Sequence, residues 1–486
     1  MPRATTRGRA AARTAEPKPA KPPAKREAEA APMTYAGSVR WLEERVNVEA
    51  MRPARVSSDA FKLDRMRALL ANLDNPHQAI KTVHVAGSKG KGSVCEMLAS
   101  CLGACGYTVG LFTSPHLVDV RERVRLAGDP ITQYSFAQAM NRVREAAERV
   151  PAKHGVPTYF ELLSALALRF FADKAVDIAV VEVGLGGRLD STNVITPEVS
   201  AITTIQLEHT QLLGDTVEKI ALEKAGIMKP GVTTITVPQE DAVLDTLRAH
   251  AAEVGATLAV LGQDIEYSWR FVAAHDMGPH ARVSVSTART EYEHLAVPLL
   301  GEHQAANCGV ALAILDRLRE RGFEAPERDV AAGLAATPNN GRLEEILDSP
   351  RIIVDGAHTP TSIKALVQSV GAHIRYDSMV VIFGCAADKD VDGMLTEIAR
   401  GADKVIFTKA ADSARAADPA DLERRFTELS GKMAQRTDTL KEAINTAARA
   451  VGREDLICIT GSFHLAGEAK KLVQQMLERK RTGAGA

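Results

Sequence analysis

The seven residues at positions 87–93 give the clearest indication of a chemical role in this chain. They read Gly-Ser-Lys-Gly-Lys-Gly-Ser and directly follow the apolar stretch 83–86. Glycines permit a tight turn, and the N–H groups of such a turn in front of a helix favour phosphate oxygens. Lysine adds a positive charge and serine a hydroxyl group for a phosphate or its metal. The expected ligand is ATP, and the residues expected to hold it are Gly87, Ser88, Lys89, Gly90, Lys91, Gly92 and Ser93.

This glycine loop departs from the strict phosphate-loop pattern, which has four residues between its glycines and a hydroxyl directly after its lysine. Here two residues separate Gly87 from Gly90, and Gly92 intervenes before Ser93. A basic surface turn is the alternative interpretation. The strand expected before the loop and the helix expected after it favour the phosphate site.

The composition is ordinary for a globular protein. The chain has 486 residues, of which 45% are hydrophobic and 25% charged, and its formal net charge is −1. This length favours two domains, and the balanced charge gives no reason to expect a nucleic-acid or membrane partner. The six cysteines lack paired metal-type spacing, which indicates reduced thiols. We therefore expect a cytoplasmic protein that acts on small molecules as a monomer.

Residues 1–32 form a distinct segment of Ala, Pro, Lys and Arg with almost no large apolar side chain. Such a segment cannot bury enough surface to fold. We expect a disordered tail there.

The rest of the chain alternates short apolar runs with helical patterns. Strands are expected at 83–86, 109–112, 178–183, 199–205 and 233–237, and then at 351–354, 379–383, 404–408 and 456–460. Helices are expected near 92–105, 132–149, 160–173, 302–319, 360–370, 391–401, 439–451 and 465–478. This alternation indicates parallel sheets covered on both faces. The predicted fold is α/β, with a P-loop parallel-sheet ATPase domain at 33–341 and a smaller Rossmann-like α/β domain at 342–486, joined at a turn-rich hinge.

Polar residues follow most of these strands, where open α/β sheets bind their ligands. The candidates in the first domain are Ser114, Glu182 and His209, and those in the second are Asp355, His358, Lys389 and Ser462. Each residue alone could be a cap or a loop side chain. Together they predict a substrate site between the two domains.

Lys224 lies on the apolar stripe of a helical pattern at 217–228. By spacing alone, a lysine that extends its ammonium group to solvent is the simpler interpretation. The alternative is a partly buried lysine whose amine loses its proton easily.

The motifs are similar to those of the folylpolyglutamate synthase and dihydrofolate synthase family, within the Mur ligase superfamily. The matching stretches, in family order, are 83–93, 110–117, 158–168, 180–194, 207–231, 301–307, 341–344, 354–360 and 459–468. The resemblance implies that ATP and Mg²⁺ support amide formation between a folate or dihydropteroate carboxylate and L-glutamate, through an acyl phosphate. It also implies that the first domain binds ATP and the second binds glutamate.

The resemblance also implies roles for individual residues. Metal ligands would be Ser114, Glu182 and His209, while Asn307, Arg342 and Asp355 would contact the nucleotide. Catalytic roles would belong to Lys91, Lys224 and His358, with Lys224 carbamylated by CO₂. Phe160 would face the pteridine, and His358 and Ser462 would handle the incoming glutamate.

Three departures from the family pattern bear on the residue roles that the resemblance implies. Ser88-Lys89 stands where Thr-Asn is common, Glu208 replaces an aspartate before the metal histidine, and Thr359 replaces an asparagine. Three alternatives remain open: a Mur-like ligase for a different acid, a P-loop protein that uses ATP as a switch, and a non-catalytic scaffold.

Overall fold

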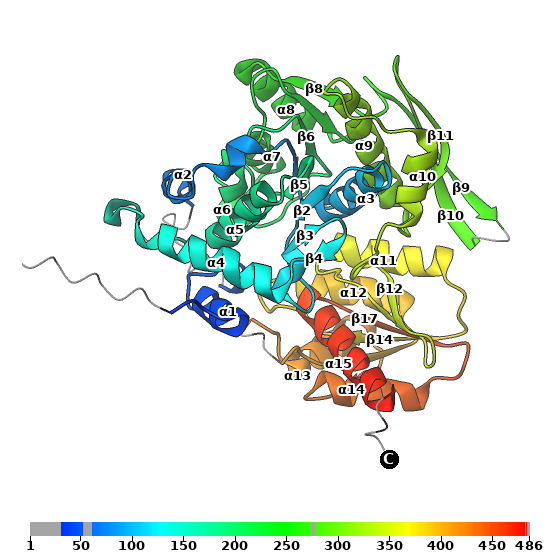
Figure 1. The fold of residues 1–486 in the computed structure, drawn as a ribbon. Helices are drawn as coiled ribbons and strands as arrows, with labels where there is room; N and C mark the ends of the chain where they lie inside the picture. The colour runs from blue at the N-terminus through cyan, green and yellow to red at the C-terminus, as the bar shows by residue number, and fades with distance from the viewer. Residues whose placement is uncertain are drawn as a thin grey trace, which may run out of the picture.

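The computed structural model describes residues 31–51, 61–274, 278–411, 413, 415–481 and 483. The predicted tail at 1–32 therefore lies outside the described residues except for its last two positions. Within the described residues, the strands form sheets of eight, three and six strands. The eight-stranded sheet and its helices occupy the upper half of Figure 1, and the six-stranded sheet with its helices lies below.

The eight-stranded sheet confirms the expected parallel core. Its order is β4-β3-β2-β5-β1-β6-β7-β8, and all neighbours from β2 to β8 pair in parallel. The strands are β1 (Thr82–Ala86), β2 (Val109–Phe112), β3 (Val124–Leu126), β4 (Asp129–Pro130), β5 (Ile178–Glu182), β6 (Val199–Ile202), β7 (Thr233–Thr236) and β8 (Thr257–Val260). β1 is thus a central strand, and the loop that follows it lies at the middle of the sheet edge.

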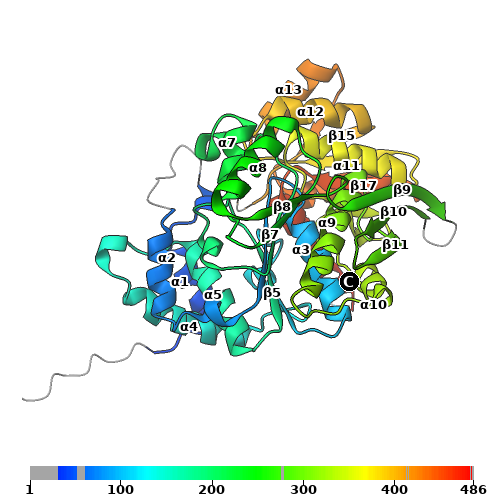
Figure 2. The ribbon, with the colours of Figure 1, turned by 90° about the horizontal axis from the view of Figure 1, so that it is seen from above.

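Helices cover both faces of this sheet because successive strand residues point in opposite directions. Val180 of β5 packs with α3 (Lys91–Ala104), α9 (Glu302–Arg319) and α10 (Glu327–Ala335). Its neighbours Ala179 and Val181 pack on the opposite side. The elements on that side are α1 (Tyr35–Glu43), α2 (Leu63–Ala71), α4 (Gln133–Glu148) and α5 (Tyr159–Asp173). Figure 2 shows the two groups of helices on either side of the strands.

A third cluster forms beside the β6 and β7 end of the sheet. There α7 (Val217–Ala225) and α8 (Asp241–Val254) bury side chains with Ala86 and Ile202. The four-residue helix α6 (Thr210–Leu213) precedes them. The three-stranded antiparallel sheet, β9 (Glu266–Ala274), β10 (Gly278–Ser286) and β11 (Glu291–Ala296), packs against α9 and is absent from the sequence prediction.

The six-stranded sheet has the order β12-β13-β17-β14-β15-β16, with β12 antiparallel and the others parallel. Its strands are β12 (Glu344–Leu347), β13 (Ile352–Val354), β14 (Met379–Phe383), β15 (Lys404–Phe407), β16 (Gln435–Arg436) and β17 (Leu456–Thr460). On one face lie α11 (Pro360–His373), α12 (Val391–Gly401) and α13 (Pro419–Ser430), and on the other α14 (Leu440–Ala450) and α15 (Phe463–Arg481). This is the second α/β unit that the sequence predicts.

Candidate active site

Three side chains from distant parts of the chain lie in close contact with the glycine loop. A β-carbon at Gly87 would overlap the hydroxyl of Thr203, and one at Gly90 would overlap the carboxamide of Asn307. One at Gly92 would meet the guanidinium group of Arg342 and lie 3.6 Å from Oε1 of Glu182. The backbone φ is +145° at Gly87 and +95° at Gly90, which other residues rarely adopt. The loop therefore needs its glycines both for conformation and for space.

The first part of the loop is anchored to the strand beside it. The N–H groups of Ser88 and Lys89 both donate to the carbonyl oxygen of Thr204, at 2.9 and 3.2 Å. The Ser88 hydroxyl donates to the carbonyl oxygen of Gln206 at 3.0 Å. These groups have partners within the protein, and α3 begins directly after them at Lys91, with Gly90 as its N-cap residue.

Two lysines converge on the first residue of the loop. Lys91 donates to the carbonyl oxygen of Gly87 at 3.0 Å, and Lys224 donates to the same oxygen at 2.9 Å. Lys224 comes from α7, is 1% exposed and also lies 3.1 Å from Oε1 of Glu208. The simpler interpretation of a solvent-reaching lysine is therefore wrong, because a carbonyl and a carboxylate hold the ammonium group inside.

The charged groups of this cluster change one another's pKa values. Burial lowers the pKa of Lys224 to about 8, although Glu208 opposes the shift. Burial also disfavours ionised Glu208, but the cations of Lys224, Lys91 and Lys89 outweigh it and lower the pKa of Glu208 to about 2. Glu208 is thus an anion among three lysines at the rim of the loop.

Of the predicted metal ligands, Ser114 and Glu182 lie together at the carboxyl ends of β2 and β5. Glu182 is buried, and its Oε2 accepts a hydrogen bond from the backbone N–H of Ser114 at 3.0 Å. Burial raises the pKa of Glu182 against the opposing charges of Lys91 and Arg342. His209 precedes α6 with a left-handed backbone, and desolvation by the surrounding protein, with the cations of Lys389 and Lys91, lowers its pKa to about 4. The carboxylate of Glu182 beside the glycine loop fits an oxygen-preferring divalent cation, for which the nitrogen of His209 is a softer ligand.

Protein side chains alone do not complete a metal site here. Within the described ranges, no three or more His, Cys, Asp and Glu side chains gather as a metal-holding group. Mg²⁺ commonly takes one or two carboxylates and fills its remaining positions with water and substrate phosphate oxygens. Glu182 beside the loop is compatible with that kind of site.

The second α/β unit contributes His358 and Asp355. His358 Nε2 lies 3.2 Å from Nζ of Lys89, so a loop of the six-stranded sheet touches the glycine loop of the other domain. Asp355 follows β13 and accepts hydrogen bonds from the N–H groups of Leu343 and Ala357 at 2.9 and 2.8 Å. Burial raises the pKa of Asp355 to about 6 despite these bonds.

Helix caps account for two of the polar residues noted in the sequence. Thr359, one of the departures from the family pattern, caps α11 by accepting from the N–H of Ser362 at 3.3 Å. Ser462 accepts from the N–H of Leu465 at 3.1 Å in the first turn of α15. A serine hydroxyl that accepts at a cap can still donate one hydrogen bond.

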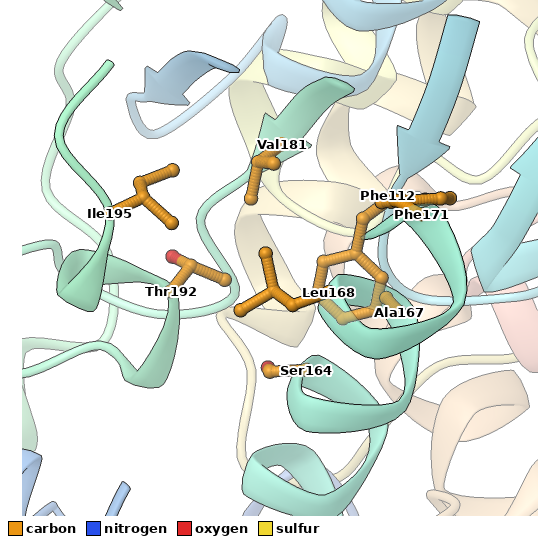
Figure 3. Close-up of a pocket in the computed structure, with 8 residues that line it drawn as sticks. All are labelled: Phe112, Ser164, Ala167, Leu168, Phe171, Val181, Thr192 and Ile195. Carbon is orange, nitrogen blue, oxygen red and sulfur yellow. The ribbon is translucent and has the colours of Figure 1, made fainter. Parts of the chain in front are cut away.

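Phe160 lies beside the loop that follows β5. Its ring contacts that of Phe112 with 5.7 Å between centroids, and a β-carbon at Gly184 would overlap it. Phe112 also lines a small space between α5 and the sheet, and the lining of this space does not include Phe160 (Figure 3). The space is too small for a water molecule, so it is a gap in the packing of α5 against the sheet.

Two further residues contribute here: Lys389, which its position after a strand predicted as a candidate without a specific role, and Gln304, which no pattern indicated. Lys389, which follows β14, acts electrostatically on both His358 and Lys89 and helps to lower their pKa values, where burial is the main cause. Gln304 accepts a hydrogen bond from Nδ2 of Asn307 at 2.9 Å and so fixes that carboxamide. The position of Lys389 after a strand was a usable signal, whereas nothing in the spacing marked Gln304.

Comparison with known families and structures adds independent information. Residues 85–315 match the Mur ligase middle domain, and residues 341–463 match the Mur ligase glutamate ligase domain. In sequence, the chain is 34% identical to the folylpolyglutamate synthase of Lacticaseibacillus casei, over 84% of this chain and 93% of that protein. It is also 34% identical to a probable bifunctional folylpolyglutamate synthase/dihydropteroate synthase of Halobacterium salinarum, over 83% of this chain. The chain spans 48% of that longer protein.

Solved structures agree with the sequence comparison. The fold matches Mycobacterium tuberculosis folylpolyglutamate synthase complexed with ADP and AMPPCP, with a TM-score of 0.81, 30% identity and coverage of 90% of this chain and 99% of the other. It matches Escherichia coli FolC in complex with DHPP and ADP with a TM-score of 0.77, 28% identity and coverage of 91% and 98%. Among the residues that the structure describes, no helix combines the length and the apolar character needed to cross a membrane.

Proposed function

The chain belongs to the folylpolyglutamate synthase and dihydrofolate synthase family of Mur ligases, and on this premise we propose that it is an ATP-dependent ligase that joins L-glutamate to a folate or dihydropteroate carboxylate. The observation that carries the proposal is the contact of Lys89 in the glycine loop with His358 of the second domain. A nucleotide loop and a loop of the glutamate ligase domain thus meet at one site.

The chemistry requires activation because a carboxylate is a poor acyl donor. In the proposed reaction, the carboxylate oxygen of the acceptor attacks the γ-phosphorus of ATP, the bond to the ADP oxygen breaks, and an acyl phosphate forms. The free amine of L-glutamate then attacks the acyl carbon, phosphate leaves with the electron pair of its bond to carbon, and the amine loses a proton. Positioning and charge neutralisation dominate such phosphoryl transfer.

The residues around the glycine loop can supply both the positioning and the neutralisation of phosphate charge that the reaction needs. We assign ATP to the segment from Gly90 to Ser93 at the start of α3, with the cations of Lys91 and Arg342 beside its phosphates. The guanidinium group of Arg342 lies directly against Gly92, which supports this assignment. Asn307 lies against Gly90 and would contact the nucleotide, and Asp355 would hold the hinge backbone at Leu343.

The proposed Mg²⁺ ligands are Glu182, the hydroxyl of Ser114 and His209. When bound, the ion would neutralise phosphate charge during transfer. The support for it is the buried carboxylate of Glu182 next to Gly92, where a phosphate would otherwise meet an unscreened anion.

We propose that Lys224 reacts with CO₂ to give a carbamate, as the resemblance implies. Carbamylation needs the neutral amine, and burial lowers the pKa of Lys224 to about 8, so part of the population is neutral near physiological pH. Lys89 and Lys91 would balance the additional negative charge beside Glu208.

On the substrate side, we propose that Phe160 faces the pteridine and that His358 and Ser462 handle the incoming glutamate. We also propose that residues 33–341 form the ATP-binding domain and 342–486 the glutamate-binding domain of a cytoplasmic monomer. The two family matches, to 85–315 and 341–463, support this division. The six cysteines are free in the structure, which is compatible with a reducing compartment.

Mass spectrometry of the reaction products tests the proposed activity. Purified protein is incubated with ATP, Mg²⁺ and L-glutamate, and with either dihydropteroate or tetrahydrofolate as acceptor. The expected result is a product heavier by one glutamyl residue with at least one acceptor. Absence of such a product from both acceptors, in protein that binds ATP, would contradict the proposal and leave a ligase for another acid or an ATP-dependent switch.

A further inference from the structure

The two lysines of the glycine loop point their ammonium groups to different places. Nζ of Lys91 folds back to the carbonyl oxygen of Gly87, inside the loop. Nζ of Lys89 leaves the loop and lies 3.2 Å from Nε2 of His358, which is 269 residues later in the chain. The carboxylate of Glu208 lies 3.8 Å from the same ammonium group. Lys89 therefore faces the second domain, whereas Lys91 stays with the loop.

The tautomer of His358 determines which group donates the hydrogen bond between Lys89 and His358. Nδ1 of His358 lies 2.8 Å from the carbonyl oxygen of Gly356, which can only accept, so Nδ1 carries the proton. In the neutral ring, Nε2 is then the acceptor, and the ammonium group of Lys89 is its donor. Burial, followed by the cations of Lys89 and Lys389, lowers the pKa of His358 to about 3, which keeps the ring neutral. Two hydrogen bonds thus fix the imidazole, one from each domain.

The base of the Lys89 side chain is also fixed. Its backbone N–H is bonded to the carbonyl oxygen of Thr204, and the neighbouring Ser88 is tied to Gln206. This anchoring holds residues 88 and 89 against the segment 204–206. Both the N–H and the ammonium group of Lys89 thus have partners within the protein, Thr204 and His358 respectively.

We infer that Lys89 is a positioning residue for the amino-acid half of the reaction, acting through His358, and is not a phosphate ligand. The inference rests on the proposed function, because it assigns His358 to the incoming L-glutamate. It gives a role to one of the departures from the family pattern. This chain has Lys89 at a position where the family commonly has asparagine, whose side chain is shorter and uncharged.

Steady-state kinetics on Lys89→Met tests the inference. Methionine keeps the unbranched stem but removes both the charge and the donor. The expected result is a rise in KM for L-glutamate of about tenfold or more, the order of effect for losing one charged hydrogen bond, with KM for ATP changed by less than about twofold. Lys89→Arg keeps a donor and is expected to recover part of the loss. Calorimetry with ATP on each variant measures nucleotide binding separately.

Lys364→Met is the matched control, since Lys364 is an exposed lysine of α11 in the second domain. It is expected to leave both KM values unchanged. A rise in KM for ATP that equals or exceeds the rise for glutamate, or no change in KM for glutamate in Lys89→Met, would overturn the inference. Failure of the wild-type protein to make any glutamyl product would instead overturn the proposed function, so the two failures are distinguishable.

Discussion

Lys224 donates a hydrogen bond to the carbonyl oxygen of Gly87, which joins helix α7 to the first residue of the glycine loop across 137 positions of sequence. Lys91 shares that oxygen, and Glu208 neutralises Lys224 from the other side. The loop therefore depends on a buried ion pair for its position. Buried pairs cost more when one partner is removed than when both are absent.

Replacing Lys224 with alanine is expected to lower kcat by about 100-fold or more, because a buried carboxylate and the loop carbonyl lose their shared partner. If the carbamate is formed, short carboxylic acids such as acetate should partly restore activity. Lys219→Ala is the control, since Lys219 is an exposed residue of the same helix whose ion pair with Asp215 contributes little. A fully active Lys224→Ala variant would eliminate both the anchoring role and the carbamate.

Substitution by alanine should have opposite effects at two glycines of helix α3. Gly92→Ala places a methyl group against the guanidinium group of Arg342 and beside Glu182, so turnover of ATP should fall. Gly103→Ala meets nothing within 4 Å and should stabilise the helix by about 1 kcal/mol with unchanged activity. Thermal unfolding and steady-state kinetics distinguish these outcomes. Equal activities of the two variants would contradict the close contact of Arg342 with the loop.

The ionised carboxylate of Glu208 should make the protein more stable above pH 4.5 than at strongly acidic pH. Burial opposes its ionisation, but Lys224, Lys91 and Lys89 lower its pKa from 4.5 to about 2 in the folded state. The unfolded chain therefore takes up the proton first, and stability from this group is lost as pH falls from 4.5 through 2.

Urea unfolding between pH 2 and pH 7 measures this effect in the wild type and in Glu208→Gln. The variant should be less stable at pH 7, and the difference between the two free energies of unfolding should shrink toward pH 2. Glu253→Gln, at an exposed helix position, should follow the wild type. A difference that stays constant with pH would show that Glu208 acts by packing alone.

Phe160→Ala is expected to raise KM for the pterin-containing acceptor about tenfold while KM for ATP stays constant. The ring packs against Gly184 and Phe112, at the ends of β2 and β5. Tyr134→Ala, a substitution of a 71% exposed aromatic residue on α4, should change neither constant. An increase confined to KM for ATP would move the acceptor site elsewhere.

Buried parallel strands were predictable because they read as continuous apolar runs between turns. The predicted bounds of β2, β14 and β17 coincide with those in the structure. The strand predicted at 199–205 ends instead at Ile202, because Thr204 no longer pairs with a sheet strand and forms an isolated antiparallel bridge with Lys89, its carbonyl oxygen accepting from Ser88 and Lys89. The antiparallel strands β9 to β11 were missed because little of their length is a continuous apolar run. In β9, Tyr267, Trp269 and Phe271 instead alternate with polar residues, the pattern of a strand with one solvent-facing side.

Site residues were predictable by their position after strands, but their partners were not. Glu182 and His358 stand where the strand-end rule places ligand groups, and the structure brings both to the glycine loop. The hydrogen bonds of Lys224 to Gly87 and of Lys89 to His358 join residues 137 and 269 positions apart. Local spacing carries no information about such pairs, which only tertiary packing determines.

Coupled ADP release tests most directly whether the two domains act at one site. Purified protein is supplied with ATP, Mg²⁺ and a folate or dihydropteroate acceptor, and ADP is followed with and without L-glutamate. Sustained ADP release is expected only when acceptor and L-glutamate are both present, with one ADP formed for each glutamyl product. ADP release that proceeds unchanged without L-glutamate would contradict the account and indicate a simple ATPase.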